Sequence, residues 1–194
     1  MHSQDLQLVR SGKIPLSSLI TIRKGELAHN PLSGKIQPVT VELVKIVGTG
    51  RQWDCCYFNK EVGCTVYEDR PFACRVLKCW DTGKILDLVE KDTLGRFDIL
   101  YQDDPLIPVI KEHERMCACD DLGFIQSNLN RLSEQQKNEL EKRVRNDLRF
   151  RTRVITDFQL KLSEELFYFG RPFFQLLQPL GVRISESPTG VHLI

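Results

Sequence analysis

Seven cysteines are the residues of this 194-residue chain whose type and spacing could do chemistry. Thiolates are soft ligands that hold zinc in a tetrahedron or iron in an iron–sulfur cluster. Free cysteines that only fill a core would be scattered, whereas five of these fall within one short segment, and the clustering favours metal ligation. The five are Cys55, Cys56, Cys64, Cys74 and Cys79, and the other two flank Ala118.

Four of the clustered cysteines have a spacing that suits one metal centre. We predict that they bind either zinc or iron, and an iron–sulfur cluster is one form that the iron could take. The spacing lacks a tight C-x-x-C pair, so the ligands must come from separate strands and helix ends. Cys56 is left out, because successive side chains of a strand point to opposite faces. The pattern C-x(8)-C-x(9)-C-x(4)-C is formed by Cys55, Cys64, Cys74 and Cys79.

The residues around these cysteines form a longer pattern. A Cys-Cys-Tyr-Phe run begins at Cys55, and the pattern C-x-x-Y-x-x-R-P-x-x-C-R extends from Cys64 to Arg75. These residues resemble the C-terminal half of the YkgJ-like cysteine-cluster family, which is described as zinc- or iron-chelating. The resemblance implies that Cys55, Cys64 and Cys74 stand at the family's later cysteine positions. Cys79 is not general to the family but would complete a set of four thiolates.

The chain departs from the family at one point. The family usually opens with a C-x-x-C-x-x-C-C cluster, whereas no cysteine precedes Cys55 here. Either Met1 is an internal start of a longer protein, or this member has lost part of its site. The remaining four cysteines could still hold the metal, Cys117 and Cys119 could join them, or the chain could be metal-free. His113 lies one helical turn before Cys117, although such a histidine is more often an exposed polar residue than a ligand.

Composition excludes several classes of protein. Hydrophobic residues make up 41% of the chain and charged residues 27%, which is typical of a globular protein with its own core. The net charge of +1 creates no global field toward nucleic acid or an anionic membrane. No apolar run approaches the roughly 20 residues that span a bilayer, and the first residues lack a secretory signal. We therefore expect a cytoplasmic protein, where clustered thiols rarely form structural disulfides.

One local charge pattern needs a separate interpretation. Six basic residues are concentrated in one segment, with Asp147 as the acidic residue that opposes them. Such a face could contact phosphates, but Phe150 is the only aromatic residue interleaved for base stacking. A solvated helix face is the more ordinary interpretation, and nucleic-acid binding is therefore not expected. The six are Lys142, Arg143, Arg145, Arg149, Arg151 and Arg153.

The N-terminal half should contain short strands and one short helix that carry the cysteines. Residues 1–38 look weakly structured, apart from a short helix over 16–22 that Pro15 could open. The β-branched residues of 39–47 alternate with polar ones and predict a strand. Two β-prone runs within 53–67 predict a hairpin with Cys55 and Cys64 on its arms. A short helix over 72–77, begun at Pro71, would carry Cys74.

The C-terminal half should be helical. Further helices are expected from residue 81 or 82 and over 104–116. Ser133 and Gln136 form a capping-box signature, and Leu140, Val144 and Leu148 then recur every four residues as a narrow apolar stripe. A second helical stretch is expected over 155–166, and a terminal hairpin over 183–194.

These features predict an α+β fold that is mainly helical, with a small antiparallel hairpin in the cysteine-rich region and a C-terminal helical pair. We divide the chain into an N-terminal segment (1–38), a cysteine-rich metal-binding domain (39–125) and a helical region packed on it (126–194). The predicted function is metal binding in a structural or redox role. A partner-binding helical protein with a vestigial cysteine site is one alternative. The other is part of a methylase-like enzyme, because the family's domain also occurs in a flagellin lysine methylase, but no catalytic residues are recognisable here.

Overall fold

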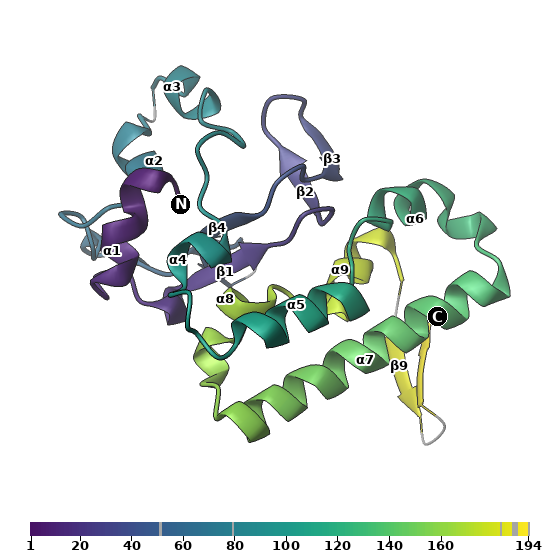
Figure 1. Ribbon diagram of the computed structural model, residues 1–194. Helices are drawn as coiled ribbons and strands as arrows, with labels where there is room; N and C mark the ends of the chain where they lie inside the picture. The colour runs from purple at the N-terminus through teal and green to yellow at the C-terminus, as the bar shows by residue number, and fades with distance from the viewer. Residues whose placement is uncertain (51, 79, 183, 188–189, 194) are drawn as a thin grey trace.

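The protein has an α+β fold in which most strands belong to the N-terminal half and most helical residues to the C-terminal half (Figure 1). The computed structural model describes the whole chain except residues 51, 79, 183, 188–189 and 194. In the part of the chain that is described, the sheets are two-stranded and antiparallel. The predicted fold class is confirmed.

A two-stranded sheet lies at the centre of the N-terminal half. Its strands β1 (Leu19–Ile22) and β4 (Leu43–Ile46) pair antiparallel, with the first residue of β1 opposite the last residue of β4. All four residues of β1 are buried. This burial explains its unbroken Leu-Ile-Thr-Ile run, since a strand covered on both faces shows no alternation of apolar and polar residues. Helix α8 (Glu165–Phe169) contacts β1 and supplies part of the cover.

The expectation that residues 1–38 are weakly structured is wrong. Besides β1, they form α1 (Leu6–Arg10) and the hairpin of β2 (Leu27–Asn30) with β3 (Lys35–Pro38). The predicted helix over 16–22 shrinks to a 3-10 turn before β1. These elements are too short to be stable alone, and the local sequence therefore gives only a weak signal for them. Burial stabilises α1 and β1, which contribute the buried Val9 and Leu19, whereas the β2–β3 hairpin is half-buried or exposed.

The cysteine-rich segment contains the predicted hairpin in a different register. Strands β7 (Phe58–Asn59) and β8 (Gly63–Cys64) pair, with Phe58 opposite Cys64. The turn between them is closed by Asn59, whose side-chain oxygen accepts the N–H groups of residues 61 and 62 at 2.8 and 3.3 Å. Cys55 is not on this hairpin. It ends β6 (Asp54–Cys55), which pairs with β5 (Gly48–Thr49).

Helices account for most of the remaining fold. The predicted short helix around Cys74 is present as α2 (Phe72–Val76), and the predicted terminal hairpin is present as β9 (Ile184–Ser187) and β10 (Gly190–Leu193). The turn residues of that hairpin lie outside the described residues. The other helices are α3 (Gly83–Leu86), α4 (Arg96–Ile99), α5 (Ile107–Met116), α6 (Leu122–Asn128), α7 (Glu134–Phe158) and α9 (Phe173–Leu177).

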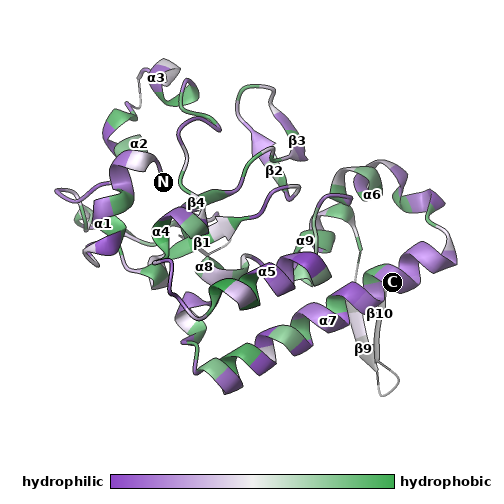
Figure 2. Ribbon diagram, in the orientation of Figure 1, coloured by the Kyte–Doolittle hydropathy of each residue, from purple (hydrophilic) through white to green (hydrophobic). Residues whose placement is uncertain are grey.

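Helix α7 is a single helix of 25 residues, longer than the sequence pattern predicted. Its capping box is confirmed: the backbone N–H of Gln136 donates to Ser133 Oγ at 3.2 Å, and that of Ser133 donates to Gln136 Oε1 at 2.8 Å. Figure 2 shows hydrophilic and hydrophobic residues alternating along it. The predicted stripe is only partly right, because Leu148 is 37% exposed. The buried face instead includes Asp147 and Arg151.

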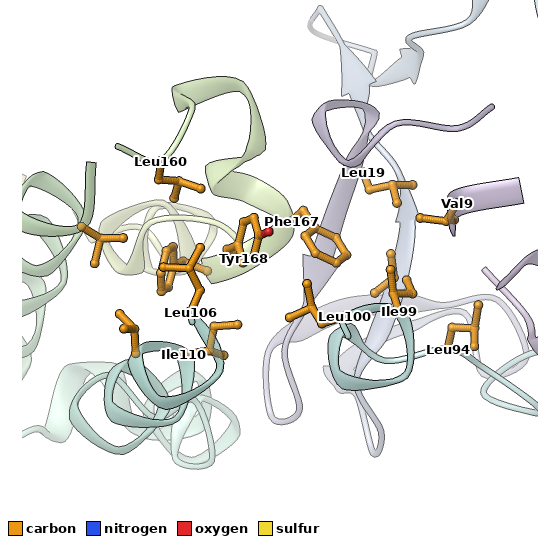
Figure 3. Packing of buried hydrophobic residues seen from close by; sticks show 14 of the residues in the cluster. Val9, Leu19, Leu94, Ile99, Leu100, Leu106, Ile110, Leu160, Phe167 and Tyr168 are labelled. Atoms are coloured by element: carbon orange, nitrogen blue, oxygen red, sulfur yellow. The ribbon is translucent and has the colours of Figure 1, made fainter. Parts of the chain in front are cut away.

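The buried hydrophobic residues form two clusters, and α7 contributes its C-terminal half to the larger one and its N-terminal half to the smaller one. The larger cluster joins the two halves of the chain, since Phe167 of α8 lies against Leu19 and Leu100, and Tyr168 lies toward Leu106 and Leu160 (Figure 3). The smaller cluster packs α6, α7 and α9 together. Three of the five residues of α8, Phe167, Tyr168 and Phe169, thus connect the strands to the helices, and these three are buried.

Candidate metal centres

Three of the four predicted thiol ligands come from three different elements. Cys55 ends β6, Cys64 ends β8, and Cys74 lies in α2. Backbone hydrogen bonds place them: Cys56 N–H donates to the carbonyl of Val47 at 3.1 Å, and Thr65 N–H donates to the carbonyl of Tyr57 at 2.9 Å. The first turn of α2 is held by the Phe72 N–H, which donates to Asp5 Oδ1 at 2.7 Å.

Two of these thiols act on the third. Partial desolvation raises the pKa of Cys74, and the negative potential of Cys55 and Cys64 raises it further. Cys55 and Cys64 therefore lie near enough to Cys74 to act on its charge. Their sulfur atoms nevertheless do not all lie within 4.8 Å of one another, as far as the described residues show. We call the set of Cys55, Cys64 and Cys74 the thiol cluster, and it is an open group rather than a closed tetrahedron.

The thiol cluster faces solvent. Cys55 and Cys74 are exposed and Cys64 is half-buried, and all three are free thiols. The fourth predicted ligand, Cys79, lies outside the described residues, so the complete set of four remains a prediction. Cys56 is half-buried, and desolvation together with the neighbouring Cys55 raises the pKa of its thiol.

A second group of potential ligands lies in the interior. His113 of α5, Cys117 just after that helix, and Asp147 of α7 are all buried, and their ligand atoms lie within 4.8 Å of one another. None of the three has measurable exposed surface. Imidazole, thiolate and carboxylate are all zinc ligands, so this buried triad could hold a metal ion.

Asp147 is the centre of this group. One carboxylate oxygen, Oδ1, lies 2.6 Å from His113 Nε2, and Oδ2 accepts the backbone N–H of Phe173 at 2.8 Å. Arg151, one helical turn later, donates from Nε to both oxygens at 3.0 Å. Burial opposes ionisation of the carboxyl, but the hydrogen bond from His113 and the charge of Arg151 outweigh it and lower the pKa of Asp147. Asp147 is therefore a buried carboxylate.

His113 is packed among aromatic rings. The ring centres of Phe150 and Phe169 lie 5.2 and 5.1 Å from the imidazole. Desolvation lowers the pKa of His113 and outweighs the opposite effect of Asp147. The imidazole is therefore neutral near pH 7, the state that a metal ligand requires. Its Nδ1 is buried and has no hydrogen-bond partner.

The two cysteines near the triad are unlike those of the thiol cluster. Burial raises the pKa of Cys117 and of Cys119 to about 12. The Cys117 thiol makes one long contact, 3.9 Å to the carbonyl of Arg143, and the Cys119 thiol lies 3.9 Å from the carbonyl of Cys117. Without a metal both remain protonated, and Cys119 belongs to the smaller hydrophobic cluster.

Sequence reasoning found only part of the triad. It identified His113 and Cys117 as one helical turn apart but expected the histidine to be exposed, and the structure shows that this expectation is wrong. Asp147 was interpreted only as a counter-charge to the basic run. The available signal was its position three residues after Val144 and three before Phe150, which places a carboxylate on the buried face of an amphipathic helix.

Much of the basic run of α7 is paired with carboxylates. Arg143 forms two hydrogen bonds to Asp121 at 2.7 and 2.9 Å, and Arg153 lies 3.7 Å from Glu112. Arg151 is only 4% exposed and points into the protein. This segment is therefore not a continuous free cationic surface.

Comparison of the chain with family models, with curated proteins and with solved structures finds no match. The resemblance to the YkgJ-like family therefore remains a prediction that rests on the residues quoted above. Among the described residues, no helix combines the length and the apolar character needed to cross a bilayer.

Proposed function

We propose that this chain is a metal-binding protein whose thiol cluster, together with Cys79, holds zinc or iron in a structural or redox role. The observation that supports this most directly is that Cys55, Cys64 and Cys74 come from three separate elements, and that the first two lie near enough to the third to raise its pKa. Free cysteines that served only as small apolar residues would be buried singly, whereas Cys55 and Cys74 are exposed.

Electrostatics favours a cation at this position. Desolvation raises the pKa of Cys74, and the negative charge of Cys55 and Cys64 raises it further. A divalent ion removes that penalty, because it replaces the protons and neutralises the thiolates. The sulfur atoms must move closer on binding. Strands of two residues and a helix of five residues, all near the surface, can make such a small adjustment at low cost.

Elemental analysis of anaerobically purified protein tests the proposal. Brown protein with visible absorbance and stoichiometric iron indicates an iron–sulfur cluster, and colourless protein with stoichiometric zinc indicates a zinc site. Cys55→Ser and Cys74→Ser should each remove about one equivalent of the cluster or ion, because Ser is a poor ligand for either metal. Cys56→Ser is the matched control and should keep the full metal content.

Circular dichroism establishes that each variant is folded, so that lost metal reports on ligation. Folded Cys55→Ser and Cys74→Ser proteins with the metal content of the parent would overturn the proposal. Loss of metal in the Cys56→Ser control to the same degree would also contradict it, because the ligand assignment would then be wrong.

A further inference from the structure

The interior of the protein contains a ligand set that the thiol cluster does not use. His113 lies in the last turn of α5, and Cys117 follows the helix directly, with its N–H donating to the carbonyl of His113 at 2.8 Å. Asp147 approaches from α7, and the ligand atoms of all three lie within 4.8 Å of one another. One nitrogen, one sulfur and one oxygen ligand form a set that suits a borderline-soft divalent ion such as zinc.

Asp147 has the kind of outer hydrogen bonds that metal-binding carboxylates usually have. Arg151 Nε lies 3.0 Å from both carboxylate oxygens, Oδ2 also accepts the N–H of Phe173 at 2.8 Å, and Oδ1 faces the imidazole at 2.6 Å. Outer hydrogen bonds of this kind fix the orientation of a ligand and are a regular part of metal sites.

Two polar groups of the set lack good partners. His113 Nδ1 is buried without a hydrogen bond, and the Cys117 sulfur has only its 3.9 Å contact to a carbonyl. Buried polar atoms are nearly always satisfied in native proteins, and an unpaired one costs about 1–3 kcal/mol. The unpaired nitrogen and the weakly bonded thiol leave His113 and Cys117 free to take a further partner.

We propose that His113, Cys117 and Asp147 form a second metal site, buried and suited to zinc, which is separate from the thiol cluster. Because the three residues have no exposed surface, the site is structural: its ion joins α5 to α7 and exchanges slowly. The site does not depend on the function proposed for the thiol cluster, since it shares no ligand with it.

Cobalt(II) is the probe, because a cobalt–thiolate bond gives a charge-transfer absorption that nitrogen and oxygen ligands do not. The background is the variant Cys55→Ser/Cys64→Ser/Cys74→Ser/Cys79→Ser, which lacks the thiol cluster and Cys79. When refolded with cobalt(II), it should bind one equivalent with a thiolate band. Adding Cys117→Ser should remove the band, and adding Cys119→Ser should leave it, although both cysteines are buried and only two residues apart.

If the four-fold serine variant folds but binds no cobalt(II), or binds it without a thiolate band, the proposal of a second metal site is wrong. If the background variant does not fold, zinc analysis of single variants of the parent protein decides: Cys117→Ser should lose one equivalent, and Cys119→Ser should lose none. Equal metal content in both overturns the proposal. Failure of the thiol-cluster proposal is recognised separately, by unchanged metal content in Cys55→Ser and Cys74→Ser.

Discussion

His113 and Asp147 are joined by a 2.6 Å hydrogen bond between two helices, and neither side chain has exposed surface. Through Asp147 the contact extends to Arg151, which donates to the carbonyls of Phe169 at 3.0 Å and Gly170 at 3.1 Å. These carbonyls belong to the turn between α8 and α9. One carboxylate therefore connects α5, α7 and the segment that joins the two hydrophobic clusters.

Asp147→Asn should destabilise the protein strongly. The amide keeps the shape of the carboxylate but loses its charge, and its NH₂ group faces at least one of the donors from His113, Arg151 and Phe173. The buried positive charge of Arg151 then lacks one of its neutralising carboxylates, which should lower the free energy of unfolding by about 3–5 kcal/mol. Urea denaturation of metal-free protein measures the change.

The control for this substitution lies on the same helix. Asp157→Asn changes an exposed residue of α7, and we expect a change in the free energy of unfolding within about 0.5 kcal/mol. Equal effects of the two substitutions would show that the buried carboxylate is not a determinant of stability.

Gly170→Ala should destabilise the turn that receives Arg151. Gly170 has φ 65° and ψ −164°, a region that is essentially restricted to glycine. An added Cβ would also lie 2.8 Å from the carbonyl oxygen of Thr21 in the buried strand β1. We expect the free energy of unfolding to fall by about 3 kcal/mol or more, since strain and a backbone clash combine.

Gly12→Ala separates these two contributions. Gly12 also has positive φ, 76°, but nothing lies within 4 Å of an added Cβ. Only the backbone strain remains, and we expect a loss of about 1 kcal/mol. Thermal denaturation of both variants tests this order. A larger loss of stability in Gly12→Ala than in Gly170→Ala would show that the predicted clash at Gly170 does not contribute.

Tyr168 should make stability depend on pH in the alkaline range. Burial raises its pKa from 10.0 to about 12, and the nearby carboxylates of Asp104 and Glu164 act in the same direction. The folded protein therefore holds the phenol proton more tightly than the unfolded chain does. The resulting stabilisation is complete below pH 10 and is lost as the pH rises toward 12.

Tyr168→Phe isolates that contribution, because the ring remains in the hydrophobic cluster while the titrating group is removed. We expect the parent to lose up to about 2 kcal/mol more stability than the variant between pH 9 and pH 12. Urea denaturation curves across this range provide the comparison. Parallel pH profiles would mean that the folded and unfolded proteins ionise Tyr168 alike.

Alkylation should distinguish the two groups of cysteines. In native, metal-free protein, iodoacetamide should modify the exposed Cys55 and Cys74 and spare Cys117 and Cys119, which react only after denaturation. Burial excludes the reagent, and a pKa of about 12 leaves almost no thiolate at those two positions. Peptide mass spectrometry locates the label. Zinc should protect Cys55 and Cys74, and undiminished labelling at saturating zinc would contradict ligation by the thiol cluster.

Local signals in the sequence were sufficient for several elements. The capping box at Ser133 predicted the start of α7, and the proline before Phe72 predicted the helix of Cys74. Turn residues predicted the hairpin that ends at Cys64. In each case the determining contacts lie within a few residues, so the pattern can be read without knowledge of the fold.

Longer-range features could not be obtained in this way. The all-buried strand β1 depends on α8, which lies more than a hundred residues later in the chain. The burial of His113 beside Asp147 requires α5 and α7 to pack with particular faces together, and periodicity alone placed Leu148 on that face instead. Helix packing selects the buried face by the fit of all its neighbours, which a single helix does not encode.

The amino-acid sequence by itself determined that the protein is an α+β chain rich in free thiols, and it located the segment in which most of them lie. Only the tertiary structure decided which ligand atoms come closest together among the described residues: an imidazole, a thiol and a carboxylate in the interior, and not the thiols of the cysteine-rich segment. The reason is physical. A coordination site needs atoms a few ångströms apart, and that proximity is produced by packing between elements distant in sequence rather than by spacing along the chain.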